Sequence, residues 1–321
     1  MTAPNKTQGG DGFLPDSRGH RYGDQLRFIA RFPAYTTVDQ PQGLTWWYRQ
    51  GDDVASLDLR WAPGKGGGVS GVSVSGDVAW GSWIMRRDID PLPEGAVVAG
   101  MPEPHRQLFD RYGGIRPVVF PDPFEGLAWA ILGQQISVAF AAQLKNAVAE
   151  RYGTMVEDGG RRLSVFPSAS VLSRVTADEL RGMKLSRQKA ETLIAVAQAA
   201  DDGTWDLQEL YSKPSQEAYK ALVRIKGIGP WTAEYCLLRA FGHPDILPAG
   251  DVALRRSWAR ASEKALVSES ELRQAGEVWR GMRSDFAFWL WLDNLSRRHA
   301  RIFEISQPER MDNGDGGTDF A

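Results

Sequence analysis

The chain has few of the residues from which proteins build disulfides, metal clusters and membrane spans. One cysteine in 321 residues, Cys236, allows neither an internal disulfide nor a cluster held by four cysteines. The four histidines are widely spread and offer little material for a zinc site. The longest unbroken apolar run, Phe286 to Leu292, is far shorter than the ~20 residues that span a bilayer. Residues 1–15 lack the apolar segment of a secretory signal, so we expect a soluble cytoplasmic protein.

An excess of charge of one sign is also missing. The 38 basic and 40 acidic residues give a net charge of −2, so the overall field does not support a nucleic-acid-binding function. Such a function has to rest on local geometry. The hydrophobic, aromatic and charged fractions of 42%, 10% and 24% are those of an ordinary globular protein, and a chain of this length generally forms more than one domain.

The N-terminal third predicts an antiparallel sheet with one covered face. Apolar residues recur with period two in four runs that Gly, Asp and Pro separate. The runs are Leu26/Phe28/Ala30/Phe32, Leu57/Leu59/Trp61, Val72/Val74 and Trp83/Met85. We therefore expect a sheet-containing domain over residues 25–116. Residues 1–24 are polar and glycine-rich, and we expect them to be flexible.

One stretch within this region satisfies the nucleotide-binding pattern G-x-G-x-x-G through Gly66, Gly68 and Gly71. The residues that follow are strand-like, and no helix is available there to receive a pyrophosphate. We interpret the stretch as a hairpin between two strands.

Beyond residue 116 the chain is predicted to be helical almost to its end. A helix beginning at Asp122 or Pro123 is followed by a second one over 136–152. Three further helix starts are marked by capping residues, Thr176, Ser186 and Ser268. We expect the helical region to cover residues 117–305 and a disordered tail to cover 306–321. The predicted fold class is α+β, with a β-rich antiparallel N-terminal domain followed by an all-helical core.

The segment Leu222 to Gly242 carries the most informative pattern. Gly227, Ile228 and Gly229 separate two predicted helices, the second of which begins at Pro230 or Trp231. Two glycines one residue apart make a tight hairpin whose backbone N–H groups lie at a helix N-terminus. Such a hairpin binds phosphate without a basic side chain. A plain corner between two helices, with glycines for packing, explains the same residues.

A carboxylate stands at a second predicted helix start. Asp251 lies nine residues past Gly242 and directly before Val252, where the helical pattern resumes. Taken alone, it is an N-cap worth ~1 kcal/mol. Its spacing from the glycine hairpin gives it a second interpretation, as a reactive group.

The hairpin I-K-G-I-G-P-W-T-A followed by L-P-x-x-D resembles the helix-hairpin-helix superfamily of DNA glycosylases, and within it the 3-methyladenine DNA glycosylase II type of alkylation-repair enzyme. Pro123–Leu144 resembles the helix pair that opens the catalytic region of that family, and Arg283–Trp291 resembles its closing helix. The resemblance covers about residues 117–300. It implies two helical lobes with the active-site cleft between them. It also implies a monomer without a cofactor, associated with the nucleoid, whose partner is damaged double-stranded DNA.

The resemblance assigns roles to residues of this chain. It makes Asp251 the catalytic carboxylate, which stabilises the positive charge that develops on the sugar. The remaining roles are a base pocket of Trp231, Tyr235 and Trp291, a DNA wedge of Gln134 and Gln135, and a phosphate-binding hairpin of Gly227, Ile228 and Gly229. It implies no metal held by side chains and allows a monovalent cation on the backbone carbonyl oxygens of the hairpin. Glutamines that merely finish a helix, and a Tyr235 that merely packs in the core, are the competing interpretations.

Trp231 stands where the related glycosylase/lyases have a lysine that attacks C1′ of the sugar. The resemblance therefore implies a monofunctional hydrolase that removes 3-methyladenine, 7-methylguanine and related bases from DNA. A glycosylase/lyase for oxidised bases and a non-catalytic helix-hairpin-helix DNA-binding protein are the alternatives. Two residues depart from the family pattern: Lys226 replaces a proline of many hairpins, and Asp285 replaces an aromatic residue, so a pocket or packing contact should differ there.

Overall fold

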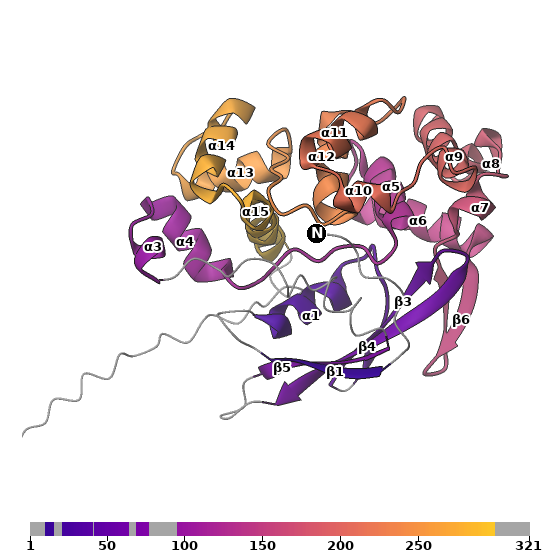
Figure 1. Cartoon of the computed structure of the whole chain (residues 1–321), viewed down its shortest axis with the longest axis horizontal. Helices are drawn as coiled ribbons and strands as arrows, with labels where there is room; N and C mark the ends of the chain where they lie inside the picture. The colour runs from indigo at the N-terminus through magenta and orange to yellow at the C-terminus, as the bar shows by residue number, and fades with distance from the viewer. Residues whose placement is uncertain (1–9, 16–20, 41, 64–68, 77–94, 299–321) are drawn as a thin grey trace, which may run out of the picture.

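The computed structural model describes residues 10–15, 21–40, 42–63, 69–76 and 95–298 (Figure 1). An antiparallel five-stranded sheet, in the order β1-β5-β4-β3-β2, forms the N-terminal part. Its strands are β1 (Gly10–Pro15), β2 (Thr36–Gln40), β3 (Gly43–Gln50), β4 (Asp53–Pro63) and β5 (Val69–Gly76). A helical region follows, and the predicted α+β fold class is confirmed.

The residues on either side of the glycine-rich stretch form two paired strands, as expected, whereas Gly66 and Gly68 themselves lie outside the described residues. Strands β4 and β5 pair antiparallel on either side of it, with Leu59 opposite Val74 and Trp61 opposite Val72. The segment after it is strand β5, so no helix follows the G-x-G-x-x-G pattern. The alternating run at Trp83 and Met85 lies outside the described residues, as does the predicted tail over 306–321.

The first predicted strand is wrong, because Tyr22–Arg31 forms helix α1. The alternation from Leu26 to Phe32 suggested a strand, yet Ile29 interrupts it with an apolar residue where a strand would be polar. Gln25, Phe28, Ile29 and Phe32 follow the spacing i, i+3, i+4 and i+7 of a helical face, and all four are buried. Part of the segment expected to be flexible is also ordered, since β1 pairs with β5 along its whole length.

The helical region contains the predicted helices at the predicted places, together with a two-stranded hairpin that the sequence did not predict. The hairpin consists of β6 (Thr154–Asp158) and β7 (Arg161–Val165). The helices before it are α3 (Gly95–Ala99), α4 (Glu103–Tyr112), α5 (Pro123–Gly133) and α6 (Val138–Tyr152). Those after it are α7 (Ala169–Leu172), α8 (Ala177–Gly182), α9 (Arg187–Asp201), α10 (Glu209–Ser212), α11 (Ser215–Val223), α12 (Pro230–Arg239), α13 (Val252–Ala261), α14 (Glu269–Gly276), a 3-10 turn (Glu277–Trp279) and α15 (Arg283–Arg298).

Local capping explains where several of these helices begin. Thr176 and Ser268 each form a complete capping box with the glutamate three residues later. Ser186 caps α9 by accepting from the backbone N–H of Lys189. The sequence predicted these three starts correctly because each cap is formed within one turn of chain.

Helix α1 lies between the sheet and the helical region (Figure 1). It packs on β2, β3 and β5, and its other side meets the helices. The rings of Phe28 and Phe288 lie 5.0 Å apart, and those of Phe32 and Trp129 lie 5.6 Å apart. The N-terminal part therefore shares one hydrophobic core with the helical region.

Candidate active site

A cavity of about 1030 Å³ opens between the helices and collects most of the residues that the sequence singled out. Its lining comes from α1, α5, the start of α6, α9, α12, α13 and α15. The lining residues predicted from the sequence are Gln134, Gln135, Gly227, Gly229, Trp231, Tyr235, Asp251 and Trp291. These predicted residues, up to 157 positions apart in the chain, thus meet at one site, whereas buried Ile228 packs in the core of the hairpin.

Asp251 is held as the N-cap of α13 and faces the cavity. Its Oδ1 accepts hydrogen bonds from the backbone N–H groups of Ala253 (2.7 Å) and Leu254 (3.1 Å). Its Oδ2 accepts from Nε1 of Trp231 at 2.8 Å. The cap and the indole together fix the plane of the carboxylate, and the helix N-terminus favours a negative charge there.

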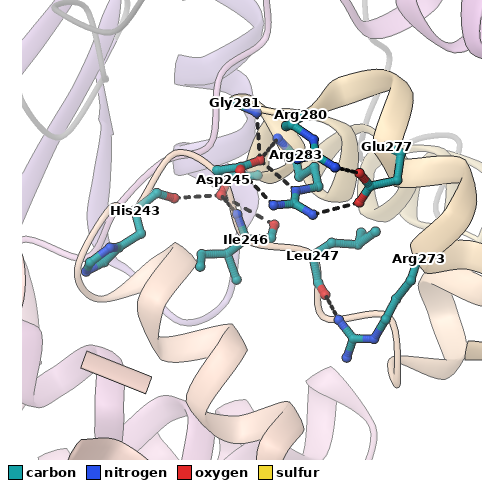
Figure 2. Close-up of polar contacts among 10 residues, drawn as sticks. His243, Asp245, Ile246, Leu247, Arg273, Glu277, Arg280, Gly281 and Arg283 are labelled. Atoms are coloured by element: carbon teal, nitrogen blue, oxygen red, sulfur yellow. Dashed lines mark hydrogen bonds and ion pairs between the residues drawn. The ribbon is translucent and has the colours of Figure 1, made fainter. Parts of the chain in front are cut away.

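The segment that leads to Asp251 is anchored to the start of α15 (Figure 2). Arg283 forms a two-pronged ion pair with Asp245, with Nε–Oδ1 and Nη2–Oδ2 distances of 2.7 Å each. Burial alone would raise the pKa of Asp245, but the hydrogen bonds and charge of Arg283 hold that pKa below its ordinary value. Next to it, Ser284 Oγ donates to the carbonyl oxygen of His243 (2.6 Å) and accepts from Ile246 N (3.0 Å). The loop before the carboxylate is therefore fixed at several points.

The three predicted pocket aromatics form one group. The ring of Tyr235 lies 5.4 Å from that of Trp231 and 5.3 Å from that of Trp291. Its hydroxyl accepts a hydrogen bond of 2.9 Å from Nε1 of Trp129. Burial raises the pKa of Tyr235 against the lowering effect of Arg239, so the hydroxyl keeps its proton at neutral pH. The indole rings of Trp231 and Trp291 are only half-buried and offer surface to a bound group.

The glycine hairpin adopts the geometry that its sequence predicts. Gly227 has a φ of 95°, which favours glycine, and a Cβ there would collide with the side chain of Thr192. Gly229 is the N-cap of α12, and a Cβ there would stand in open space. Packing requires a glycine at the first position only. The open space at the second leaves the N-terminus of α12 accessible to a phosphate.

The two glutamines after α5 have different surroundings. Nε2 of Gln134 donates to the carbonyl oxygen of Gly227 and to Oγ1 of Thr232, each at 3.0 Å. Gln135 is exposed, with a φ of 57° that non-glycine residues adopt uncommonly. Both line the cavity, so neither simply completes a helix in the protein core.

Several lining residues were not anticipated from the sequence. Arg239 lies eight residues after Trp231 on the same face of α12, a spacing that could have suggested it. Its Nε donates to the carbonyl oxygen of Val118 at 2.8 Å, and a second donor binds the Tyr35 hydroxyl. Four phenylalanine rings surround its guanidinium at 5.2–5.8 Å, namely Phe28, Phe32, Phe120 and Phe288. Phe28, Phe32, Trp129 and Phe288 come from distant segments that no local pattern connects.

The two departures from the family pattern, Lys226 and Asp285, are not among the residues that line the cavity. Asp285 is fully buried, and its Oδ1 lies 3.1 Å from Nη1 of the equally buried Arg116. The expected difference is therefore a packing contact, in which an ion pair fills the place of an aromatic side chain. Lys226 is exposed, and only its carbonyl oxygen takes part in the hairpin, by accepting from Oγ1 of Thr192 (3.3 Å).

Two classes of site have no counterpart in the part of the chain that the structure describes. No three His, Cys, Asp or Glu side chains there gather as they would around a metal ion. No described helix combines the length and apolar character needed to cross a membrane.

Comparison with known proteins agrees with this geometry. Residues 128–280 match the family model of the HhH-GPD superfamily base excision DNA repair protein. The resemblance predicted from the hairpin and the L-P-x-x-D motif is thus confirmed.

Its relatives are of the alkylation-repair type. The chain is 34% identical over 182 residues to a DNA-3-methyladenine glycosylase of Bacillus subtilis and 31% identical over 178 residues to DNA-3-methyladenine glycosylase 2 of Escherichia coli. Each match covers 56% of this chain and 60% of the relative. The structure is similar to that of the 3-methyladenine DNA glycosylase from Archaeoglobus fulgidus, with a TM-score of 0.70 and 27% identity over 89% of this chain and 98% of that one.

Proposed function

We propose that this chain is a monofunctional DNA glycosylase that flips alkylated bases out of duplex DNA and hydrolyses the N-glycosidic bond, which starts base excision repair. The observation that carries the proposal is the placement of the Asp251 carboxylate beside the Trp231, Tyr235 and Trp291 rings in one cavity. A charged group for the sugar and an aromatic surface for the base are thus side by side. The family and the named activities of its relatives support the same function.

The reaction begins with extrusion of the damaged nucleotide, because a base inside the duplex is out of reach. Backbone N–H groups at Gly229 and the start of α12 bind a phosphate of the duplex. The turn at Gln134 and Gln135 forms the wedge that fills the vacated space in the stack. The flipped base enters the cavity and stacks on the exposed faces of Trp231 and Trp291.

Bond cleavage then relies on Asp251. As the base leaves, the sugar gains positive charge, and a fixed carboxylate stabilises this oxocarbenium-like state. The cap and the indole N–H hold the carboxylate in place before the substrate arrives, so it needs no reorganisation during the reaction. Water adds to C1′ and loses a proton, and the products are the free base and an abasic site.

A glycosylase/lyase would need an amine at the sugar, and none of the described residues that line the cavity offers a free one. Trp231 occupies the position where the lyases have their lysine. The described lining of the cavity contains one lysine, Lys189. Its Nζ already donates a hydrogen bond to the carbonyl oxygen of Leu132 at 2.7 Å. This arrangement favours hydrolysis over Schiff-base chemistry.

The proposal extends to partners and ions. Damaged double-stranded DNA is the partner, which associates the protein with the nucleoid, and we propose that the protein acts as a monomer. A monovalent cation on the hairpin would share carbonyl oxygens that already accept hydrogen bonds. Lys226 O accepts from Thr192, and Gly227 O accepts from Gln134.

One experiment tests the function directly. Methylated duplex DNA is incubated with the protein, and the released bases are separated by chromatography. We expect free 3-methyladenine and 7-methylguanine, an intact abasic strand and no protein–DNA adduct after borohydride treatment. A trapped adduct at enzyme-like yield would favour the lyase alternative, and DNA binding without base release would favour the non-catalytic one.

A further inference from the structure

The turn after α5 is cross-linked to two neighbouring elements. On one side, Gln134 reaches the hairpin through its two hydrogen bonds to Gly227 O and Thr232 Oγ1. On the other side, the buried ammonium group of Lys189 on α9 holds the carbonyl oxygen of Leu132, near the end of α5. Burial lowers the pKa of Lys189, but its bond to this carbonyl gives the group a defined partner.

Helix α9 and the hairpin are also joined to each other. Oγ1 of Thr192 donates to the carbonyl oxygen of Lys226, and the same side chain packs where Gly227 has no Cβ. The wedge turn, α9 and the hairpin therefore form a closed triangle of contacts. Every side of the triangle includes a side-chain hydrogen bond to a backbone carbonyl oxygen.

We propose that Gln134 is a positioning residue that fixes the wedge turn to the phosphate-binding hairpin, and that Gln135 alone enters the DNA. The proposal rests on the function proposed above. Both amide protons of Gln134 are engaged within the protein, so its side chain can enter DNA only by breaking two bonds. Gln135 is exposed, and its φ of 57° directs the chain at the tip of the turn.

The consequence is a coupling between two operations on DNA. The hairpin holds the backbone, and the wedge has to enter the stack at a set distance from the gripped phosphate. Two groups fixed to each other keep this distance, whereas two independent groups lose it. When a mutation far from the reacting atoms displaces the substrate by about 1 Å, the reaction rate can fall by up to about 100-fold.

The test compares Gln134→Ala, Thr232→Val and Gln135→Ala with the wild-type protein. Two quantities are measured: the single-turnover excision rate from a duplex with one 3-methyladenine, and the dissociation constants for undamaged and abasic duplexes. We expect Gln134→Ala to reduce excision by about 10- to 100-fold and to reduce the preference for abasic DNA. Affinity for undamaged duplex should change by less than about threefold, because the phosphate contact stays intact. Thr232→Ser, which keeps the hydroxyl, should restore wild-type values.

A double-mutant cycle separates this proposal from a wedge made by Gln134 itself. Thr232→Val removes one of the two acceptors without touching the wedge, so it should impair excision in the same direction as Gln134→Ala. The double variant Gln134→Ala/Thr232→Val should be no worse than Gln134→Ala alone. Fully additive effects, or a silent Thr232→Val, would overturn the proposal.

A measurement on the protein without DNA keeps the inference separate from the proposed function. Hydrogen–deuterium exchange of Gln134→Ala should be faster over residues 134–136 and 226–232 than in the wild type, and unchanged over the sheet. If wild-type protein excises no base, the proposed function fails. The hydrogen–deuterium exchange still shows whether Gln134 fixes the wedge turn to the hairpin. If wild-type protein is active and Gln134→Ala equals it in excision and exchange, the cross-link has no positioning role.

Discussion

Nε1 of Trp231 donates a 2.8 Å hydrogen bond to Oδ2 of Asp251, twenty residues further along the chain. The indole therefore has two functions, since its N–H orients the carboxylate and its half-exposed ring faces the cavity. Under the proposed function, a base stacked on the ring would lie next to the carboxylate proposed to act on its sugar. A tryptophan also supplies no amine at this position, so the proposal links base binding, orientation of the carboxylate and hydrolysis through one side chain.

Replacing Asp251 with asparagine should abolish excision, with a loss of at least about 100-fold, because the preorganised charge disappears. An asparagine Oδ1 retains the cap on α13, but its amide group then faces the Trp231 N–H, which loses its acceptor. Leaving that donor unpaired costs ~1–3 kcal/mol, so a lower melting temperature is expected as well. The double variant Trp231→Phe/Asp251→Asn also removes the unpaired indole N–H. It serves as the control for the melting temperature, which it should partly restore. Excision by Asp251→Asn within about tenfold of the wild-type rate would show that another group carries the charge.

The hairpin glycines should differ in their response to alanine. Gly229→Ala adds a methyl group in open space with an ordinary φ of −87°, so the free protein should keep its stability. The methyl group would stand where a phosphate approaches, so affinity for damaged and undamaged duplex should fall by the same factor. Gly227→Ala should instead lower the melting temperature, because it strains a φ of 95° and collides with Thr192.

The affinity of the wild type and of Gly229→Ala for damaged and undamaged duplex is measured by fluorescence anisotropy at several salt concentrations. If the hairpin binds one or two phosphates without lysines, as proposed, the logarithm of the binding constant should fall with the logarithm of the salt concentration at a shallow slope of roughly −1 to −2. A Gly229→Ala variant that loses only its preference for damaged DNA would place the phosphate contact elsewhere.

The sequence predicted those parts of the site that short-range geometry determines. Asp251 caps a helix within one turn, and Gly227 and Gly229 define a hairpin within three residues, so both could be identified from spacing. Helix α1 was mistaken for a strand because Leu26, Phe28, Ala30 and Phe32 alternate, although Ile29 belongs to the buried helical face. Local periodicity cannot decide between the two when a segment is short.

The remainder of the site depends on long-range packing. Phe28 and Arg239 are more than 200 residues apart, and only the folded chain brings the guanidinium within 5.5 Å of that ring. Likewise, the different surroundings of Gln134 and Gln135 follow from where the hairpin lies, about 90 residues further along. Because the two residues are adjacent glutamines, the sequence alone gives no indication that one is bonded to the hairpin and the other is exposed.

Stability should depend on pH through Asp122, the N-cap of α5. Burial raises its pKa to about 7, and the nearby charge of Glu125 acts in the same direction. A carboxyl whose pKa is higher in the folded than in the unfolded state opposes folding when ionised. The penalty is absent below the ordinary pKa of about 4, grows as the pH rises, and is complete above about 7.

The variant Asp122→Asn keeps the acceptor for the Phe124 N–H and removes the charge. Relative to the wild type it should gain roughly 2 kcal/mol of unfolding free energy between pH 5 and pH 8, measured by urea denaturation. The exposed Asp178→Asn variant is the control and should show no such gain. A difference between Asp122→Asn and wild type that is constant across this range would contradict the raised pKa.

The aromatic cavity should favour cationic bases. Alkylation at N3 of adenine or N7 of guanine makes the base positively charged and weakens its glycosidic bond. An indole face attracts such a ring by roughly 0.5–2 kcal/mol per contact, which discriminates by a few tens-fold at most. We therefore expect broad specificity, with 3-methyladenine released fastest, 7-methylguanine also released, and neutral hypoxanthine much more slowly.

Trp291→Ala separates this stacking contribution from the rest of the site, because the Trp291 ring contacts Tyr235, whereas the indole that binds the carboxylate of Asp251 is that of Trp231. The variant should reduce excision of 3-methyladenine about tenfold while duplex affinity changes little, since the phosphate contacts lie at the hairpin. Trp47→Ala removes an indole from the sheet, where Trp47 bonds Asp158, and should leave the excision rate unchanged. Trp231→Ala should lose more than Trp291→Ala, because it removes both a stacking surface and the hydrogen bond to Asp251. If both cavity variants excise 3-methyladenine at the wild-type rate, the two rings belong to the core and the base binds elsewhere.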